Sequence, residues 1–157
     1  MQVRKGYRFR VYPTLAQQAR LAQWSGALRW LWNLAHEQRL LGLAASRKRY
    51  YTAFDQINEL TPLRAEVTWL ADVPRDVCAE LLRDLDKAWQ RCFAKVAKRP
   101  RWKARGRDNV GPCEPHPKAW RIDKDRVFFP KLGYIPAMIH RAVEGTAKTC
   151  RLVNDVG

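Results

Sequence analysis

The chain opens with an alternation of apolar and basic side chains that has the period of a half-buried β-strand. Within residues 4–12, Tyr7, Phe9 and Val11 fall on one side. The other side is basic and carries Arg4, Arg8 and Arg10. Pro13 stops the pattern. We therefore predict a first strand with a basic outer face.

A helical pattern follows this strand. Thr14 and Gln17 have the spacing of a capping box, so a helix is expected from there to about Ser25. Gly26 then interrupts the pattern, and a second helix carries Leu28, Leu31, Trp32 and Ala35 on one face. Two short helices joined at a glycine resemble a helix-turn-helix, although most helical hairpins contact no DNA.

Two further helices are predicted before residue 100. A short amphipathic helix spans about 51–60 and is closed off by Thr61 and Pro62. A longer one covers about 74–98, with Pro74 in its first turn. Its apolar residues recur at helical spacing: Val77, Leu81, Leu85, Ala88, Cys92 and Val96.

The period changes after residue 110. Three prolines fall within residues 111–117, so we expect no regular structure there. Short strands with turn residues between them are predicted over 120–122, 126–129, 134–140 and 146–153. The last of them is expected to present an unpaired edge. The chain as a whole is predicted to be α+β.

Charge narrows the possible partners. The 157 residues are 46% hydrophobic, which is enough to build a core, and 30 Lys and Arg face 15 Asp and Glu, for a formal charge of +15. Such an excess favours a phosphate-bearing partner over a merely solvated basic protein. No stretch is long and apolar enough for a membrane span, and the first residues do not resemble a signal peptide. We expect a cytoplasmic protein, associated with the nucleoid when bound, with no membrane partner and no small-molecule substrate.

The basic residues are concentrated in one segment. Residues 91–107 contain eight of them, no acid, and Trp102. Pro100 and Gly106 prevent one long helix, so these charges are expected on irregular chain that can follow a phosphate backbone. Trp102 is suited equally to base stacking and to anchoring the segment on the core. By contrast, the stripe on the preceding helix is interpreted as a solvated face: Arg83, Lys87, Arg91 and Lys95.

The sequence contains no recognisable catalytic centre. Its acids fall on predicted helix faces or in turns, and none is expected inside an apolar strand, where a two-metal nuclease would hold a carboxylate. His36, His116 and His140 are far apart in sequence. The cysteines have no Cys-x-x-Cys pair, so we predict no zinc ribbon, no disulfide and no cofactor. We expect no catalytic residue and no metal ligand.

Several segments together resemble one family, the TnpB (OrfB) proteins of insertion-sequence transposons. The opening Tyr7-Arg8-Phe9-Arg10-Val11-Tyr12-Pro13-Thr14 and Gly26-Ala27-Leu28-Arg29-Trp30-Leu31-Trp32-Asn33 look like the start of these proteins. Later matches follow in the family's order, at residues 60–63, 69–74, 82–88, 101–108, 129–133 and 144–148. Any one match is weak, but eight in one order cover nearly the whole chain.

The resemblance implies an architecture and partners. It implies an incomplete oligonucleotide-binding-like β-barrel, called the wedge, from residues 1–13 and 118–157. A helical recognition domain at 14–98, with a helix-turn-helix-like start, and a basic, proline-rich connector at 99–117 would be inserted between its parts. Full-length members bind a guide RNA and cut DNA beside a short target-adjacent motif. Their cutting residues and zinc ribbon lie C-terminal to the matching region, so no catalytic position corresponds here.

The resemblance also suggests residues that approach the target-adjacent duplex. These are the first turn of the long helix, with Arg75 and Asp76, and the residues before the short helix, Tyr50 and Tyr51. Arg75 could contact a guanine edge or a phosphate. All candidate nucleic-acid-binding residues are Arg4, Arg8, Arg10, Tyr51, Arg75, Asp76, Arg91, Lys95, Lys98, Arg99, Arg101, Trp102, Lys103, Arg105, Arg107 and Lys131.

The sequence thus predicts a chain that binds guide RNA and duplex DNA without catalysis of its own. Three alternatives stay open. The chain could be part of an intact RNA-guided endonuclease, a stand-alone repressor-like module, or the product of a degenerate reading frame that does not fold stably.

Overall fold

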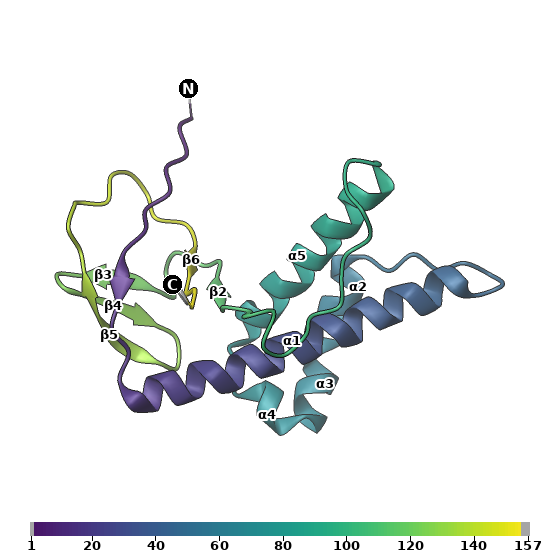
Figure 1. The fold of residues 1–157 in the computed structure, drawn as a ribbon, viewed down its shortest axis with the longest axis horizontal. Helices are drawn as coiled ribbons and strands as arrows, with labels where there is room; N and C mark the ends of the chain where they lie inside the picture. The colour runs from purple at the N-terminus through teal and green to yellow at the C-terminus, as the bar shows by residue number, and fades with distance from the viewer. Residues whose placement is uncertain (1, 155–157) are drawn as a thin grey trace.

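The computed structural model describes residues 2–154 and shows a β-rich end and a helical end joined by one long helix (Figure 1). The α+β prediction is confirmed. In chain order the elements are β1 Arg10–Val11, α1 Leu15–Ala44, α2 Ala53–Asn58, α3 Leu60–Glu66, α4 Thr68–Ala71, α5 Arg75–Phe93, β2 Cys113–Glu114, β3 Arg121–Asp123, β4 Arg126–Phe129, β5 Gly133–Met138 and β6 Cys150–Arg151. No helix among the described residues is long and apolar enough to cross a bilayer.

Helix α1 begins as predicted but does not break. The Thr14 hydroxyl accepts from the Gln17 N–H at 3.2 Å, and the Gln17 side chain accepts from the Thr14 N–H at 2.9 Å. The helix then runs for 30 residues through Gly26, so the predicted turn is wrong. An interior glycine costs a helix only about 1 kcal/mol. Burial of Trp24 and Leu28 on either side of it outweighs that cost.

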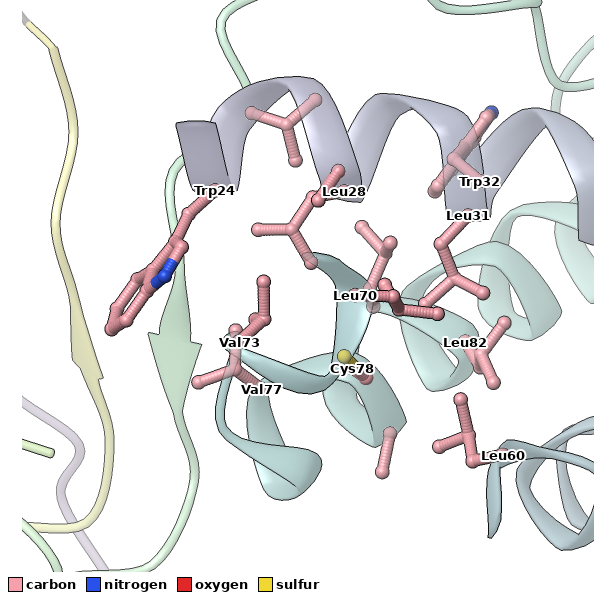
Figure 2. Packing of buried hydrophobic residues seen from close by; sticks show 14 of the residues in the cluster. Trp24, Leu28, Leu31, Trp32, Leu60, Leu70, Val73, Val77, Cys78 and Leu82 are labelled. Carbon is pink, nitrogen blue, oxygen red and sulfur yellow. The ribbon is translucent and has the colours of Figure 1, made fainter. Parts of the chain in front are cut away.

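The core lies between α1 and the helices that cross it (Figure 2). Trp24, Leu28 and Leu31 of α1 form one side of it. The opposing side comes from α3, from α4 and the turn that follows it, and from α5, with Leu60, Leu70, Val73, Val77, Cys78 and Leu82. The predicted apolar face of α5 is therefore confirmed from Val77 to Cys92, but Val96 lies beyond the end of the helix and is 66% exposed.

Helix α5 starts after Pro74, as expected, but ends at Phe93 rather than near 98. Lys95 adopts a left-handed conformation with φ 62°. Its N–H donates to the Cys92 carbonyl, and the Val96 N–H donates to the Arg91 carbonyl. This pair of bonds is a Schellman motif, which ends the helix without a glycine. The chain therefore leaves the helix early.

The short helices also differ from the prediction. The expected 51–60 helix is α2, with a Thr52–Asp55 capping box, and α3 starts directly after it. Pro62 lies in the first turn of α3 and does not end a helix. A proline is tolerated there because the N–H groups of a first turn have no helical acceptor.

The main sheet is antiparallel, in the order β1-β5-β4-β3. Strand β4 has the predicted bounds, and β3 and β5 lie within two residues of theirs. The first strand is far shorter than expected, because only Arg10 and Val11 pair, opposite Met138 and Ala137. The predicted alternation persists in the burial: Tyr7, Phe9 and Val11 are half-buried, whereas Arg8 and Arg10 are exposed.

A second, two-stranded sheet overturns one expectation. β2 lies inside the proline-rich segment 111–117 that was predicted to be irregular. It pairs with one edge of β6, and the other edge of β6 has no strand partner among the described residues, so the predicted unpaired edge remains. Gly111 permits this approach, because a Cβ there would lie 1.8 Å from the Leu152 carbonyl oxygen. The described residues form no closed barrel. Residues 1 and 155–157 of the predicted wedge lie outside the described part of the chain.

Candidate nucleic-acid interface

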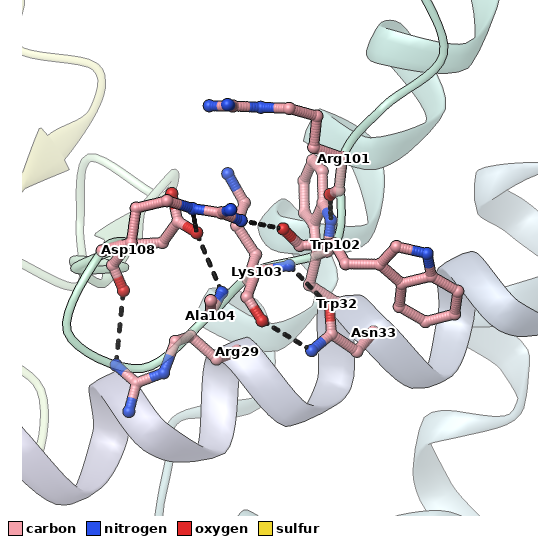
Figure 3. Close-up of polar contacts among 9 residues, drawn as sticks. Arg29, Trp32, Asn33, Arg101, Trp102, Lys103, Ala104 and Asp108 are labelled. Carbon is pink, nitrogen blue, oxygen red and sulfur yellow. Dashed lines mark hydrogen bonds and ion pairs between the residues drawn. The ribbon is translucent and has the colours of Figure 1, made fainter.

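Residues 91–107, here called the basic segment, leave the end of α5 and run back across α1 (Figures 1 and 3). As predicted, the chain beyond α5 is irregular here. Its main chain is held by α1: the Trp32 indole N–H donates to the Arg101 carbonyl at 2.9 Å. The Asn33 amide both donates to the Lys103 carbonyl at 2.9 Å and accepts from the Lys103 N–H at 2.8 Å. These bonds fix the path of the backbone.

Asp108 closes the end of the segment. Its carboxylate accepts from the Ala104 N–H at 2.8 Å and from the Arg107 guanidinium at 2.9 Å. The hydrogen bond to Ala104 is the main reason that the pKa of Asp108 is lowered. Arg107 also donates to the Trp102 carbonyl at 2.6 Å, and Arg29 of α1 reaches the Asp108 carbonyl at 3.4 Å (Figure 3). The loop is therefore ordered by contacts that leave most of its cations unused.

Two of the eight predicted cations are engaged by the protein. Arg107 pairs with Asp108, and the Lys103 ammonium lies 4.6 Å from the centroid of the Trp32 ring. The other six are exposed and have no acidic partner among the described residues: Arg91, Lys95, Lys98, Arg99, Arg101 and Arg105. Figure 3 shows the Arg101 side chain directed away from α1. Unneutralised cations along a fixed irregular chain suit a phosphate backbone.

Trp102 serves partly as an anchor. One edge packs on His36 at a centroid distance of 4.8 Å, yet the residue stays 46% exposed. His36 is only 2% exposed and also packs against Trp89. Burial, followed by the charges of Arg39 and Arg99, lowers the pKa of His36. The exposed part of Trp102 therefore remains available for stacking on a base.

The predicted duplex-reading residues lie apart from the start of the basic segment. Arg75 is exposed at the first turn of α5, and the segment starts at the other end of that helix, about 25 Å away at 1.5 Å per residue. Asp76 is only partly available, because its carboxylate lies 3.4 Å from the His116 imidazole. Tyr51 is half-buried under the Arg49 guanidinium, 4.4 Å from the ring centroid.

The remaining predicted residues lie at the β-rich end. Arg4, Arg8 and Arg10 are exposed on the N-terminal stretch, which borders an open groove formed with the first half of α1 and residues 143–154. The Lys131 ammonium instead donates to the Ala71 carbonyl at the end of α4, at 2.9 Å. Burial lowers the pKa of Lys131. Its charge is thus already used within the fold.

One acid contradicts the sequence interpretation. Glu114 lies in strand β2 and is 1% exposed, although no acid was expected inside an apolar strand. Burial raises the pKa of Glu114, and the carboxyl accepts from the His116 N–H at 3.1 Å. The described residues contain no group of three or more His, Cys, Asp or Glu placed to hold a metal ion. All four cysteines are free, and burial raises the pKa of Cys78 to about 11.

The sequence analysis missed the residues that hold the basic segment. Trp32 was assigned to an apolar face, and Asn33 appeared only as the last residue of a family-like motif. The sequence feature that could have identified Asn33 is a polar amide one position beyond a buried helix face. It indicates a side chain at the border of the core that can capture a neighbouring main chain.

A known family model matches the start of the chain. Residues 1–53 match the OrfB/IS605 family model, described as a helix-turn-helix domain. In this structure most of the matched region is the single continuous helix α1.

Two relatives extend the comparison. The chain is 27% identical over 157 residues to InsQ of Escherichia coli K12, which is named as a candidate RNA-guided DNA endonuclease; the match covers 98% of this chain and 38% of the relative. It is 31% identical over 106 residues to a similarly named protein of Streptomyces pristinaespiralis, over 66% of this chain and 26% of the relative. The chain thus spans less than two fifths of the length of either relative. The resemblance found in the sequence is confirmed, and the chain is a relative of the TnpB (OrfB) proteins of insertion sequences.

Proposed function

We propose that this chain binds a guide RNA and a DNA duplex carrying a short target-adjacent motif, and that it has no catalytic activity of its own. The observation that carries the proposal is the basic segment. Its main chain is bound to Trp32 and Asn33, and six of its cations point to solvent without an acidic partner among the described residues. A polyanion is the partner that such a surface would bind most strongly.

The domain division follows from this proposal. Residues 1–13 and 118–157 would form the wedge, 14–98 the recognition domain and 99–117 the connector. The pairing of β1 with β5 supports the division, because it joins the two ends of the sequence across the intervening helices. In this arrangement the connector carries RNA phosphates, and Arg75 contacts the DNA at the other end of α5.

Salt-dependent binding tests the proposal. The purified chain is titrated with a labelled family-type structured RNA and, separately, with duplex DNA between 50 and 300 mM salt, at values chosen to bracket about 0.15 M. We expect log affinity for RNA to fall with log salt at a slope of about −4 to −5, because six cations each neutralise one phosphate. A slope near zero, or no RNA binding at the lowest salt, would contradict the proposal.

A second arm tests the absence of catalysis. The chain is incubated with Mg²⁺, the same RNA and a matching plasmid, and we expect the plasmid to stay intact. Metal-dependent cutting that is abolished by Glu114→Gln would overturn this part of the proposal. Glu114 is the acid to test, because it is the buried carboxylate of the described chain.

The DNA contact is tested by specificity. Arg75→Ala should change the preference among target-adjacent motifs and leave RNA affinity nearly unchanged. Arg83→Ala, another exposed arginine on the same helix, is the matched control and should change neither. Equal behaviour of the two variants would show that Arg75 reads no sequence.

A second candidate is that the chain acts as part of a longer RNA-guided endonuclease. The length of the relatives favours it, since the chain matches 38% and 26% of them. The DNA downstream of the reading frame distinguishes the two: an RNase H-like continuation bearing a strand with an acid would support the second candidate, and its absence would support a stand-alone binding module.

A further inference from the structure

The outward face of the main sheet, here called the outer sheet face, has an unusual composition. Alternate residues of each strand point into the molecule, including Val127, Phe129, Ile135 and Ala137, which are buried. The intervening residues share the opposite face: Arg10 on β1, Tyr134, Pro136 and Met138 on β5, Arg126 and Phe128 on β4, and Arg121 and Asp123 on β3. The register places Arg121 opposite Phe128, and Phe128 opposite Tyr134, across three neighbouring strands.

Four of these side chains form a continuous set of planar groups. The Phe128 and Tyr134 rings meet edge to face at 5.3 Å. The Arg121 guanidinium lies 4.3 Å from the Phe128 centroid and donates to the Tyr134 hydroxyl at 2.8 Å. The Arg126 guanidinium lies 3.8 Å from the Tyr134 centroid. The two arginines are therefore held by the rings beneath them, in fixed positions.

Both arginines remain exposed, and the only acid bonded to either among the described residues is Asp123, 3.0 Å from Arg126. Covering this face with another apolar protein surface would bury two guanidinium groups against a single carboxylate, which is unfavourable. A nucleic acid strand fits better. Its bases stack on aromatic rings and on guanidinium planes, and its phosphates complement the positive charge.

We propose that the outer sheet face binds unpaired nucleotides of RNA, stacking bases on the layer formed by Arg121, Arg126, Phe128 and Tyr134. This inference rests on the proposed function, since it assigns a further site for the RNA partner. It differs from the basic segment in kind. The basic segment neutralises phosphates in any nucleic acid, whereas the outer sheet face requires bases that are free of pairing.

Charge-preserving variants separate stacking from simple attraction. Arg121→Lys combined with Arg126→Lys keeps both charges and removes both guanidinium planes. The probe is a 12-nucleotide single-stranded RNA with 2-aminopurine at its centre, titrated with the full chain at a fixed salt concentration. We expect about tenfold weaker binding and loss of the 2-aminopurine quenching, with an unchanged salt slope. Arg47→Lys with Arg83→Lys, exposed arginines away from the sheet, should leave both signals as in the unchanged chain.

Three results would overturn the inference. Unchanged affinity and quenching would show that the arginines are merely solvated. An equal loss for fully paired RNA of the same length would show contact with the backbone and not with bases. Tighter binding of single-stranded DNA than of RNA, lost in the same variant, would assign the face to DNA.

Two further variants keep the test decisive. Tyr134→Phe retains the ring and removes only the hydroxyl, so it should preserve quenching. Arg121→Lys alone should give a partial loss if the double variant melts early. If neutralising the basic segment weakens RNA binding as expected but the sheet variants have no effect, this inference is rejected and the proposed function is retained.

Discussion

Two cationic regions of this molecule use their charge in different ways. At the junction of α1, α4 and the β4–β5 turn, Arg20 donates to the Asp72 carboxylate at 2.7 and 3.1 Å and also bonds the Lys131 carbonyl. The Lys131 ammonium is bound to the Ala71 carbonyl. In the basic segment, six cations have no such acceptor among the described residues. The junction directs its charges inward, and the segment directs them outward.

The difference lies in where the acceptors are. At the junction the acceptors meet the cationic side chains themselves: the hydrogen bond from Arg20, aided by the Trp24 indole N–H, lowers the pKa of Asp72 to about 2. In the basic segment, Trp32 and Asn33 meet the main chain instead. The cations at the junction therefore stabilise the fold. The six exposed cations of the basic segment leave the stability of the fold unchanged and remain available for a ligand.

The largest effect on stability is expected from Asp72→Ala. The change leaves Arg20 and the buried Trp24 indole without their shared acceptor, so the free energy of unfolding should fall by about 2–3 kcal/mol. Urea denaturation followed by circular dichroism measures it. Asp125→Ala, at an exposed turn acid with no ion pair among the described residues, is the control and should stay within about 0.5 kcal/mol. Equal losses in the free energy of unfolding for the two variants would show that the charges at the junction do not stabilise the fold, and the two regions would then not differ.

Asn33→Ala should have a smaller effect. It removes two hydrogen bonds from the Lys103 main chain, at a cost of about 1–2 kcal/mol. Amide exchange should become faster over residues 101–108 while α5 stays protected. The exposed Asn58 at the end of α2 provides the control through Asn58→Ala. Unchanged exchange in the segment would mean that it is held by other contacts.

A pH dependence is expected at the base of the segment. His36 has a lowered pKa because it is buried, so the folded state binds its proton less readily than the unfolded state. The stability contributed by the neutral His36 side chain is therefore complete above the pKa of about 6.5 that this side chain has in the unfolded chain. That contribution is lost as the pH falls below this pKa. Melting curves from pH 8 to pH 5.5 should show this loss, and His36→Phe should reduce it. His140→Phe, at an exposed histidine, should leave the full dependence; the reverse pattern would assign the effect elsewhere.

The sequence predicted those features that depend on local patterns. The Thr14–Gln17 cap, strand β4 and the irregular basic segment follow from residue type and spacing alone. The turn at Gly26 failed because burial of side chains on both sides overrode the weak preference of a single glycine. The pairing of β2 with β6 could not be predicted, since it depends on a close approach between residues about 40 positions apart.

The same limit applies to the candidate site. The eight cations could be identified from composition, but their division into two engaged and six free ones could not. That division depends on Trp32 and Asp108, which reach the basic segment only in the folded chain.

The salt dependence of RNA binding by one variant tests the central claim most directly. Lys98, Arg99, Arg101 and Arg105 are replaced together by Gln, leaving the stacked Lys103 and the paired Arg107 in place. Stability should change by less than about 0.5 kcal/mol, because these side chains make no contact that the fold needs. The slope of log RNA affinity against log salt should flatten by about three units. Gln replacements at four exposed cations elsewhere, Arg47, Lys48, Arg83 and Lys87, control for net charge and should flatten it by less than one unit. An unaltered slope in the first variant, or an equal change in both, would show that the basic segment is only a solvated surface.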